Sequence, residues 1–153
     1  MLISYLLLGL AAPEIGITLM RISMGVFFVI SGYHKLFNPQ RHATITKTMM
    51  DDRVPDPKFN SWFVPLIEFS GGAALVIGLL TPLAALGLFF VCCGATLLDG
   101  LKRISGWSPI DRADYVDDVL YLPEVLYAII LFSLIVMGGG PFSIDGLLIG
   151  QLL

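Results

Sequence analysis

The stretch LIEFSGGAALVIGLLTP, residues 66–82, decides the fold of this chain. It places one ionisable residue, Glu68, among apolar and small residues. It ends at Thr81-Pro82, where one helix can stop and another can start, because proline is well tolerated in a first helical turn. An uncompensated charge deep in a bilayer costs at least ~3 kcal/mol. If this segment crosses a membrane, Glu68 therefore needs a partner, a proton or a function.

The composition of the whole chain indicates a membrane protein. Of its 153 residues, 56% are apolar and only 14% are charged, and most of the charged residues lie in 35–58 and 99–118. The remaining segments are long enough to cross a hydrocarbon core, which takes roughly 17–25 helical residues. We expect four spans, at about 15–36, 62–80, 82–99 and 119–138.

These spans predict an all-α, polytopic membrane protein in which residues 1–153 form a single domain. Helices in lipid associate through small residues and interhelical hydrogen bonds. The first span offers Gly25 and Gly32, and the second offers Ser70, Ala74 and Gly78 at successive i+4 positions, with Gly71 and Gly72 beside them. The simplest assembly is an antiparallel four-helix transmembrane bundle. Residues 1–14 are either an interfacial segment that is retained or an extension of the first span.

The basic residues predict the orientation, because Lys and Arg are retained on the cytoplasmic side. They gather in the two long loops, 37–61 and 100–118, and at the edge of the first span: Lys35, Arg41, Lys47, Arg53, Lys58, Lys102, Arg103 and Arg112. We expect a multi-pass protein of the cell (inner) membrane with both termini outside and both long loops cytoplasmic. The first loop holds either a short amphipathic helix, Pro39–Met50, or a solvated segment.

Four polar residues fall at a similar depth near the inner ends of the spans. At about 1.5 Å per residue, Glu68 and Glu124 lie two turns or less above the inner face, level with His34 and Lys35. This predicts an inner-leaflet cluster of the four. Two neighbouring carboxylates would titrate apart, as a proton-handling or quinone-binding site requires. The alternative is that the cluster only locks helix to helix.

Arg21 lies near the outer face instead, about two turns into the first span. Its expected partners are Asp145 in the C-terminal tail, Glu14, or backbone carbonyls at the hairpin turn. We interpret Arg21 and Asp145 as a structural pair on the outer side.

Three segments resemble one known family. They are LMRISMGVFFVISGYHKLF (19–37), IEFSGGAALVIGLLTPLAAL (67–86) and GGGPFSIDGLL (138–148). In this order, on four apolar spans, they are similar to the DoxX-like small membrane proteins. The resemblance implies a four-helix membrane bundle. It also implies an association with membrane redox systems, such as one passing electrons from thiosulfate to quinone.

The sequence shows no metal-binding or dinucleotide-binding motif and no basic, aromatic-rich run for nucleic acid. Our leading hypothesis is an integral membrane subunit of a larger redox complex, acting as an anchor or facing quinone. Trp107, Tyr115 and Arg112 in the second loop are the expected contacts with a protein partner. An alternative is a stand-alone quinone-linked oxidoreductase, of the thiosulfate or other thiol-oxidising type, that uses Glu68 and Glu124. A small transporter ranks third. The expected ligands are membrane lipid and quinone, with no intrinsic cofactor.

Overall fold

The structure of the chain, a computed structural model, describes residues 12–105 and 118–152, and this part of the chain is helical without a strand. In chain order the elements are α2 (Pro13–Phe37), α3 (Pro39–Asp51), α4 (Pro57–Ile77), α5 (Thr81–Ala95), the π-helical segment η1 (Thr96–Gly100), α6 (Leu101–Ser105), α8 (Pro123–Met137) and α9 (Ile144–Leu152). The expected all-α class is confirmed for the described residues.

Three helices of the described chain are long and apolar enough to cross a membrane. They are Pro13–Phe37, Pro57–Ile77 and the continuous run Thr81–Ile104, which joins α5 to α6 through η1. The fourth expected span, 119–138, corresponds to the apolar helix α8, which has 15 residues. It is shorter than expected because Pro123 occupies the first helical position and Gly138, with φ 74°, ends the helix. Proline favours a helix start, and a positive φ favours glycine.

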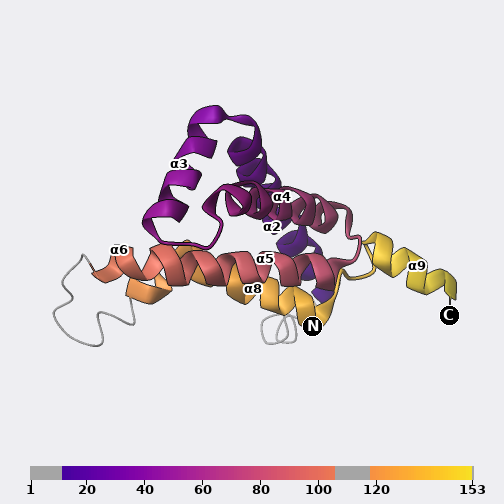
Figure 1. Cartoon of the computed structure of the whole chain (residues 1–153). Coiled ribbons are helices and arrows are strands. Elements are labelled where there is room, and N and C mark those ends of the chain that lie inside the picture. Colours follow the sequence, from indigo (N-terminus) through magenta and orange to yellow (C-terminus); the bar gives the residue numbers. More distant parts are fainter. Residues whose placement is uncertain (1–11, 106–117, 153) are drawn as a thin grey trace.

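The long helices pack against one another in chain order. Helix α2 packs against α4, α4 against α5, and α5 against α8 (Figure 1). The α4–α5 hairpin turns at Gly78–Leu80. We call this the turn end of the molecule, and the opposite end, where α3, η1 and α6 lie, the loop end. The buried core between the helices is built from Ile17, Met24, Phe28, Leu75, Ala85, Leu88, Cys92, Leu131 and Leu134.

Glycines set the close approach of α2 and α4. A Cβ atom on Gly25 would lie 2.8 Å from the carbonyl oxygen of Gly72, and one on Gly32 would lie 2.5 Å from the backbone nitrogen of Phe69. The predicted packing through Gly25 and Gly32 is therefore observed. On α4 the contact is made by Gly72, which the sequence also suggested, while Ser70 is exposed. The contacting stripe is thus displaced by two residues from the Ser70–Ala74–Gly78 face that the sequence suggested.

The expected amphipathic helix in the first long loop is confirmed as α3. The Asn38 side chain caps it, since Oδ1 accepts from the N–H groups of Gln40 at 3.0 Å and Arg41 at 3.3 Å. Asn and Asp are favoured at this position because they satisfy first-turn N–H groups. None of its residues is buried, so α3 lies on the surface of the loop end.

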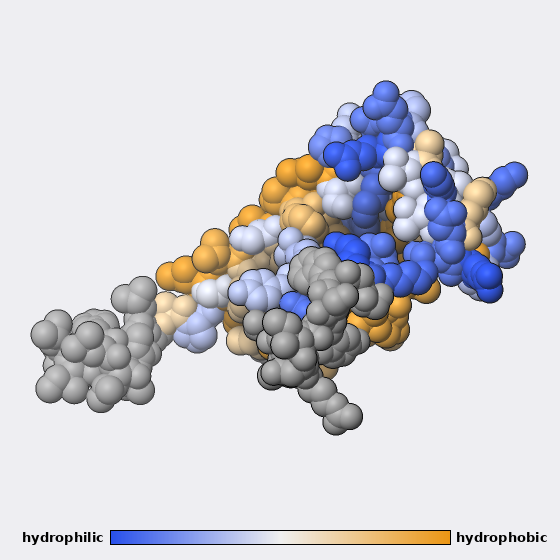
Figure 2. All heavy atoms as spheres, turned by 90° about the vertical axis from the view of Figure 1, so that its left-hand side faces the viewer, coloured by the Kyte–Doolittle hydropathy of each residue, from blue (hydrophilic) through white to orange (hydrophobic). Residues whose placement is uncertain are grey.

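The surface separates into polar and apolar regions. Viewed onto the loop end, hydrophilic residues gather on one part of the face, while apolar residues cover much of the rest (Figure 2). Large apolar side chains are widely exposed on the helices, for example Leu19, Phe90 and Val136. Exposed aromatic residues near the loop end include Phe59, Trp62 and Tyr121. A membrane protein presents such a surface to lipid, with aromatic residues enriched at the interface.

Candidate functional site

A cavity of about 880 Å³ lies at the loop end, between α2, α3, α4 and α5. Its wall is largely apolar and includes Phe27 and Ile30 of α2, Phe63 and Ile67 of α4, and Phe90, Val91 and Leu98 from α5 and η1. Polar side chains are set into this wall, namely Ser31, His34, Lys35, Arg41, Thr44, Thr48, Asp52, Asn60, Glu68 and Asp99. Ligand sites commonly combine such a cavity with a few placed polar groups.

The central polar feature of the cavity is an ion pair between Lys35 and Glu68. Lys35 Nζ donates to both carboxylate oxygens, at 2.6 Å and 2.7 Å, and the Ser31 hydroxyl donates to Oε2 at 3.2 Å. The side chain of Glu68 is only 5% exposed, whereas that of Lys35 is 30% exposed. The ammonium therefore satisfies the buried carboxylate and keeps a hydrogen that can point into the cavity.

Helix register explains how these residues meet. Because α2 and α4 are antiparallel and touch at Gly32 and Phe69, Ser31 lies level with Glu68. Lys35 is one turn further along α2, and side chains on a helix tilt towards its N-terminus. Its long stem can therefore reach back to the carboxylate. The two helices that glycine brings together thus also align the pair.

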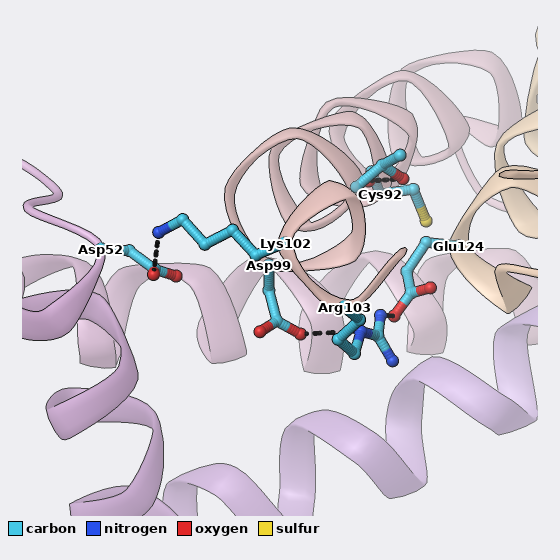
Figure 3. A network of polar contacts seen from close by, with 7 residues as sticks. Asp52, Cys92, Asp99, Lys102, Arg103 and Glu124 are labelled. Atoms are coloured by element: carbon cyan, nitrogen blue, oxygen red, sulfur yellow. Dashed lines mark hydrogen bonds and ion pairs between the residues drawn. The ribbon is translucent and has the colours of Figure 1, made fainter. Parts of the chain in front are cut away.

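The predicted four-residue cluster is divided in the structure. Lys35 and Glu68 come together, but Glu124 accepts a hydrogen bond from Arg103 Nη2 at 2.7 Å, and Arg103 Nε also pairs with Asp99 at 3.1 Å (Figure 3). His34 is exposed on the cavity rim. Depth along a helix fixes the level of a side chain but not the direction it faces, so the sequence could not separate these two pairs.

Sequence reasoning also missed the ion pair between Lys102 and Asp52 (Figure 3). It joins the residue after α3 to α6. The available signal was the concentration of opposite charges in the two long loops, which share one end of the bundle. Ser31 was also missed, because serine in an apolar helix often bonds only to its own backbone.

The turn end holds Arg21 and Asp145, but each bonds to backbone. Arg21 is 2% exposed. Its Nη1 donates to the carbonyls of Leu75 at 2.6 Å and Val76 at 2.8 Å, and its Nη2 donates to that of Phe142 at 2.8 Å. These include the expected carbonyls near the hairpin turn, whereas no ion pair joins Arg21 to Asp145 among the described residues.

Asp145 caps helix α5 from the C-terminal segment of the chain. Its two carboxylate oxygens accept from the N–H groups of Leu80 and Thr81, each at 2.7 Å. Thr81, which precedes Pro82 and could have capped the helix locally, is the first residue of the helix and makes no such bond. Asp145 is 64 residues from Thr81, so the sequence around the start of α5 contains no sign of this cap.

The pH dependence of stability should reveal this cap. Burial by itself raises the pKa of the Asp145 carboxyl, but the N–H groups of Thr81 and Leu80 and the charge of Arg21 outweigh it and lower that pKa. The carboxylate therefore stabilises the fold fully above the ordinary carboxyl pKa of about 4, and this stabilisation is lost as pH falls through the lowered value. Thermal unfolding in detergent should show the loss. Asp145→Asn should lack this pH dependence and be less stable at neutral pH by about 1 kcal/mol.

The expected partner contacts in the second long loop remain to be placed. Trp107, Tyr115 and Arg112 lie outside the described residues. Within residues 12–105 and 118–152, no three His, Cys, Asp or Glu side chains gather closely enough to hold a metal ion.

Comparison with known proteins connects the cavity to a family. The family model DoxX matches residues 16–99, which is more than half of the chain. The chain belongs to the DoxX family. Every residue that lines the cavity, from Phe27 to Asp99, falls within the part that matches DoxX. The Lys35–Glu68 pair is therefore set in the DoxX region of the chain.

A curated relative also supports the membrane location. The chain is 28% identical over 135 residues to the inner membrane protein YqjF of Escherichia coli (strain K12), covering 88% of this chain and 93% of the relative. No solved structure matches the chain. This DoxX-family protein is thus a membrane protein with apolar helices suited to lipid contact.

Proposed function

We propose that this protein is a quinone-facing integral membrane subunit of a larger membrane redox complex. The observation that carries the proposal is the cavity of about 880 Å³, whose apolar wall contains the Lys35–Glu68 pair. A quinone combines an apolar tail with two carbonyl groups. The tail would lie against Phe27, Ile30 and Phe90, and a carbonyl would accept a hydrogen bond from Lys35 Nζ.

In this proposal α8 crosses the membrane with α2, α4 and the α5–α6 run, which completes a four-helix bundle. Its 15 residues are short for a bilayer of about 30 Å, so tilt or local thinning would accommodate it. The basic residues near the loop end support an orientation in which that end would face the cytoplasm and the turn end would lie outside. The loop end, with its charged surface, would then face a cytoplasmic redox partner, which the second long loop would contact.

A stand-alone quinone-linked oxidoreductase is the second candidate. The Lys35–Glu68 pair inside the cavity favours it, because a carboxylate beside a quinone can exchange protons with it. The pairing of Glu124 with Arg103 weighs against a mechanism in which Glu68 and Glu124 act together. The subunit proposal requires only that the protein binds the quinone and holds it near a partner.

The deciding experiment is purification from native membranes in mild detergent, followed by mass spectrometry of co-eluting proteins and extracted quinones. Redox proteins in a stable ratio, together with quinone, are the expected result. A lone protein with stoichiometric quinone would favour the enzyme. If the purified protein carries no redox partner and no quinone, both candidates are contradicted.

Glu68→Gln should reduce the quinone that co-purifies by about tenfold or more. The substitution removes the charge that holds Lys35 in place, and loss of one charge-assisted hydrogen bond costs about 1.5–3 kcal/mol. Glu14→Gln, in the first turn of the same helix α2 as Lys35 but at the turn end, is the matched control and should retain normal quinone content. Equal quinone in the folded Glu68→Gln protein would place the binding site elsewhere.

A further inference from the structure

Helix α3 covers the loop end of the cavity with one face. The residues of α3 and its C-cap that line the cavity are Arg41, Thr44, Ile45, Thr48, Met49 and Asp52. Their spacing of three and four residues places them on a single side of the helix. Since no residue of α3 is buried, this side faces the cavity and is not packed into the core.

The two ends of α3 hold it in place. At the first end, His42 Nδ1 lies 3.2 Å from the Lys35 carbonyl oxygen, and the His42 ring lies 4.2 Å from that of Trp62. At the second end, Asp52 pairs with Lys102, so the helix reaches from the end of α2 to α6 (Figures 1 and 3). This second attachment is one partly exposed ion pair and can be broken at small cost.

The segment after α3 contains backbone conformations that can serve as a hinge. Arg53 and Asp56 have φ values of 55° and 44°, in the left-handed region that side chains other than glycine rarely adopt. Such residues persist only where surrounding contacts hold them. Release of Asp52 from Lys102 would remove one of the contacts that holds this segment.

The cavity also reaches the apolar flank of the bundle. Near the turn end, α4 and α5 are in close contact, and a Cβ atom on Gly71 would lie 3.1 Å from the Leu88 side chain. Nearer the loop end, Phe63 of α4 and Phe90 of α5 line the cavity and are 44% and 64% exposed. A Cβ atom on Gly94, which also lines the cavity, would meet nothing within 4 Å.

We propose that α3 is a lid that closes the cavity to water and is latched by Asp52–Lys102, and that the ligand exchanges with the bilayer between α4 and α5. The site therefore takes a membrane-dissolved amphiphile and not a water-soluble substrate. This inference rests on the proposed function only for the identity of the ligand. The latch controls aqueous access whatever amphiphile is bound.

Thiol labelling in lipid nanodiscs tests the lid, because both aqueous faces are then open and lipid covers the flank. The protein carries Gly94→Cys as the only thiol, with Cys92 and Cys93 replaced by alanine. A charged, water-soluble thiol reagent should label it slowly. Asp52→Lys should increase the labelling rate about fivefold. A partly exposed ion pair contributes little free energy, so breaking it increases the fraction of open lid only by about this factor. The charge swap Asp52→Lys with Lys102→Asp should restore slow labelling.

The matched control is Lys47→Cys, at an exposed position of α3 that does not line the cavity. Its labelling should be fast and unaffected by Asp52→Lys. An apolar maleimide dissolved in the bilayer should label Gly94→Cys at the same rate in latched and unlatched protein, because its route does not pass the lid. Equal rates for the charged reagent with and without the latch would overturn the lid. An apolar-maleimide rate that rises on unlatching as much as that of the charged reagent would overturn the lateral route. The labelling experiment contains no quinone, so its result does not depend on whether the protein binds quinone.

Discussion

Replacing Arg21 by leucine should unfold the turn end of the protein. Arg21 is almost completely buried and donates three hydrogen bonds to backbone carbonyls, two on α4 and one before α9. Leucine would leave the Phe142 carbonyl without this donor and would remove the link between α2, α4 and the C-terminal segment. Hydrogen bonds between membrane helices are each worth about 0.6–1.7 kcal/mol, and bonds from a charged donor fall towards the upper end. We expect a loss of roughly 2–4 kcal/mol of stability.

Lysine at position 21 distinguishes charge from geometry. It keeps the positive charge, but its single ammonium group cannot span the carbonyls of Leu75 and Phe142 as the planar guanidinium fork does. Arg21→Lys should therefore be nearly as unstable as Arg21→Leu in steric-trapping or thermal unfolding measurements. If lysine restores full stability, the charge alone matters and the bonded geometry does not. Lys47→Leu, on the exposed face of α3, is the control and should be close to neutral.

The contrast between the two ends of the molecule shows what the sequence could and could not predict. The spans follow from length and apolarity, and the basic residues give the expected orientation. The positions of Lys35 and Glu68 along their spans predicted that the two lie at one depth, and in the structure they form an ion pair. Depth also suggested Glu124, which turns to Arg103 instead, because the direction of a side chain depends on how η1 and α8 are rotated.

The cavity had no sequence signature of its own. Phe27, Ile30 and Phe90 resemble residues that face lipid, and only the packing of four elements gives them a shared space. Asp145 was expected to pair with Arg21. It lies near enough for the charge of Arg21 to lower the pKa of its carboxyl, but its carboxylate bonds to the N–H groups at the start of α5. A cap and its helix are usually adjacent in sequence, so the pattern at Thr81-Pro82 suggested the local residue. In both cases the missing information is tertiary, and neither composition nor periodicity contains it.

Gly32→Ala should destabilise the protein and also weaken its ligand site. A Cβ atom at this position would lie 2.5 Å from the Phe69 nitrogen and 2.8 Å from the Pro65 carbonyl oxygen. Both are backbone atoms, so no side chain can move aside, and α2 and α4 must separate. Overpacking costs about 1–3 kcal/mol, and contacts this short with backbone atoms belong to the upper end of that range. The cost therefore exceeds the gain of about 1 kcal/mol that alanine brings to a helix.

Two matched variants separate an effect on stability from an effect on the ligand site. Gly16→Ala, in the same helix, places its Cβ in open space and should be neutral or slightly stabilising. Gly25→Ala meets the Gly72 oxygen and Val76 at 2.8 Å, so it should destabilise the protein by an amount similar to Gly32→Ala. It lies about two turns from the Lys35–Glu68 pair, however, whereas Gly32 lies next to Ser31. Bound quinone should therefore fall more in Gly32→Ala than in Gly25→Ala at equal stability. Equal losses would mean that the close helix contact supports the fold but does not align the ion pair.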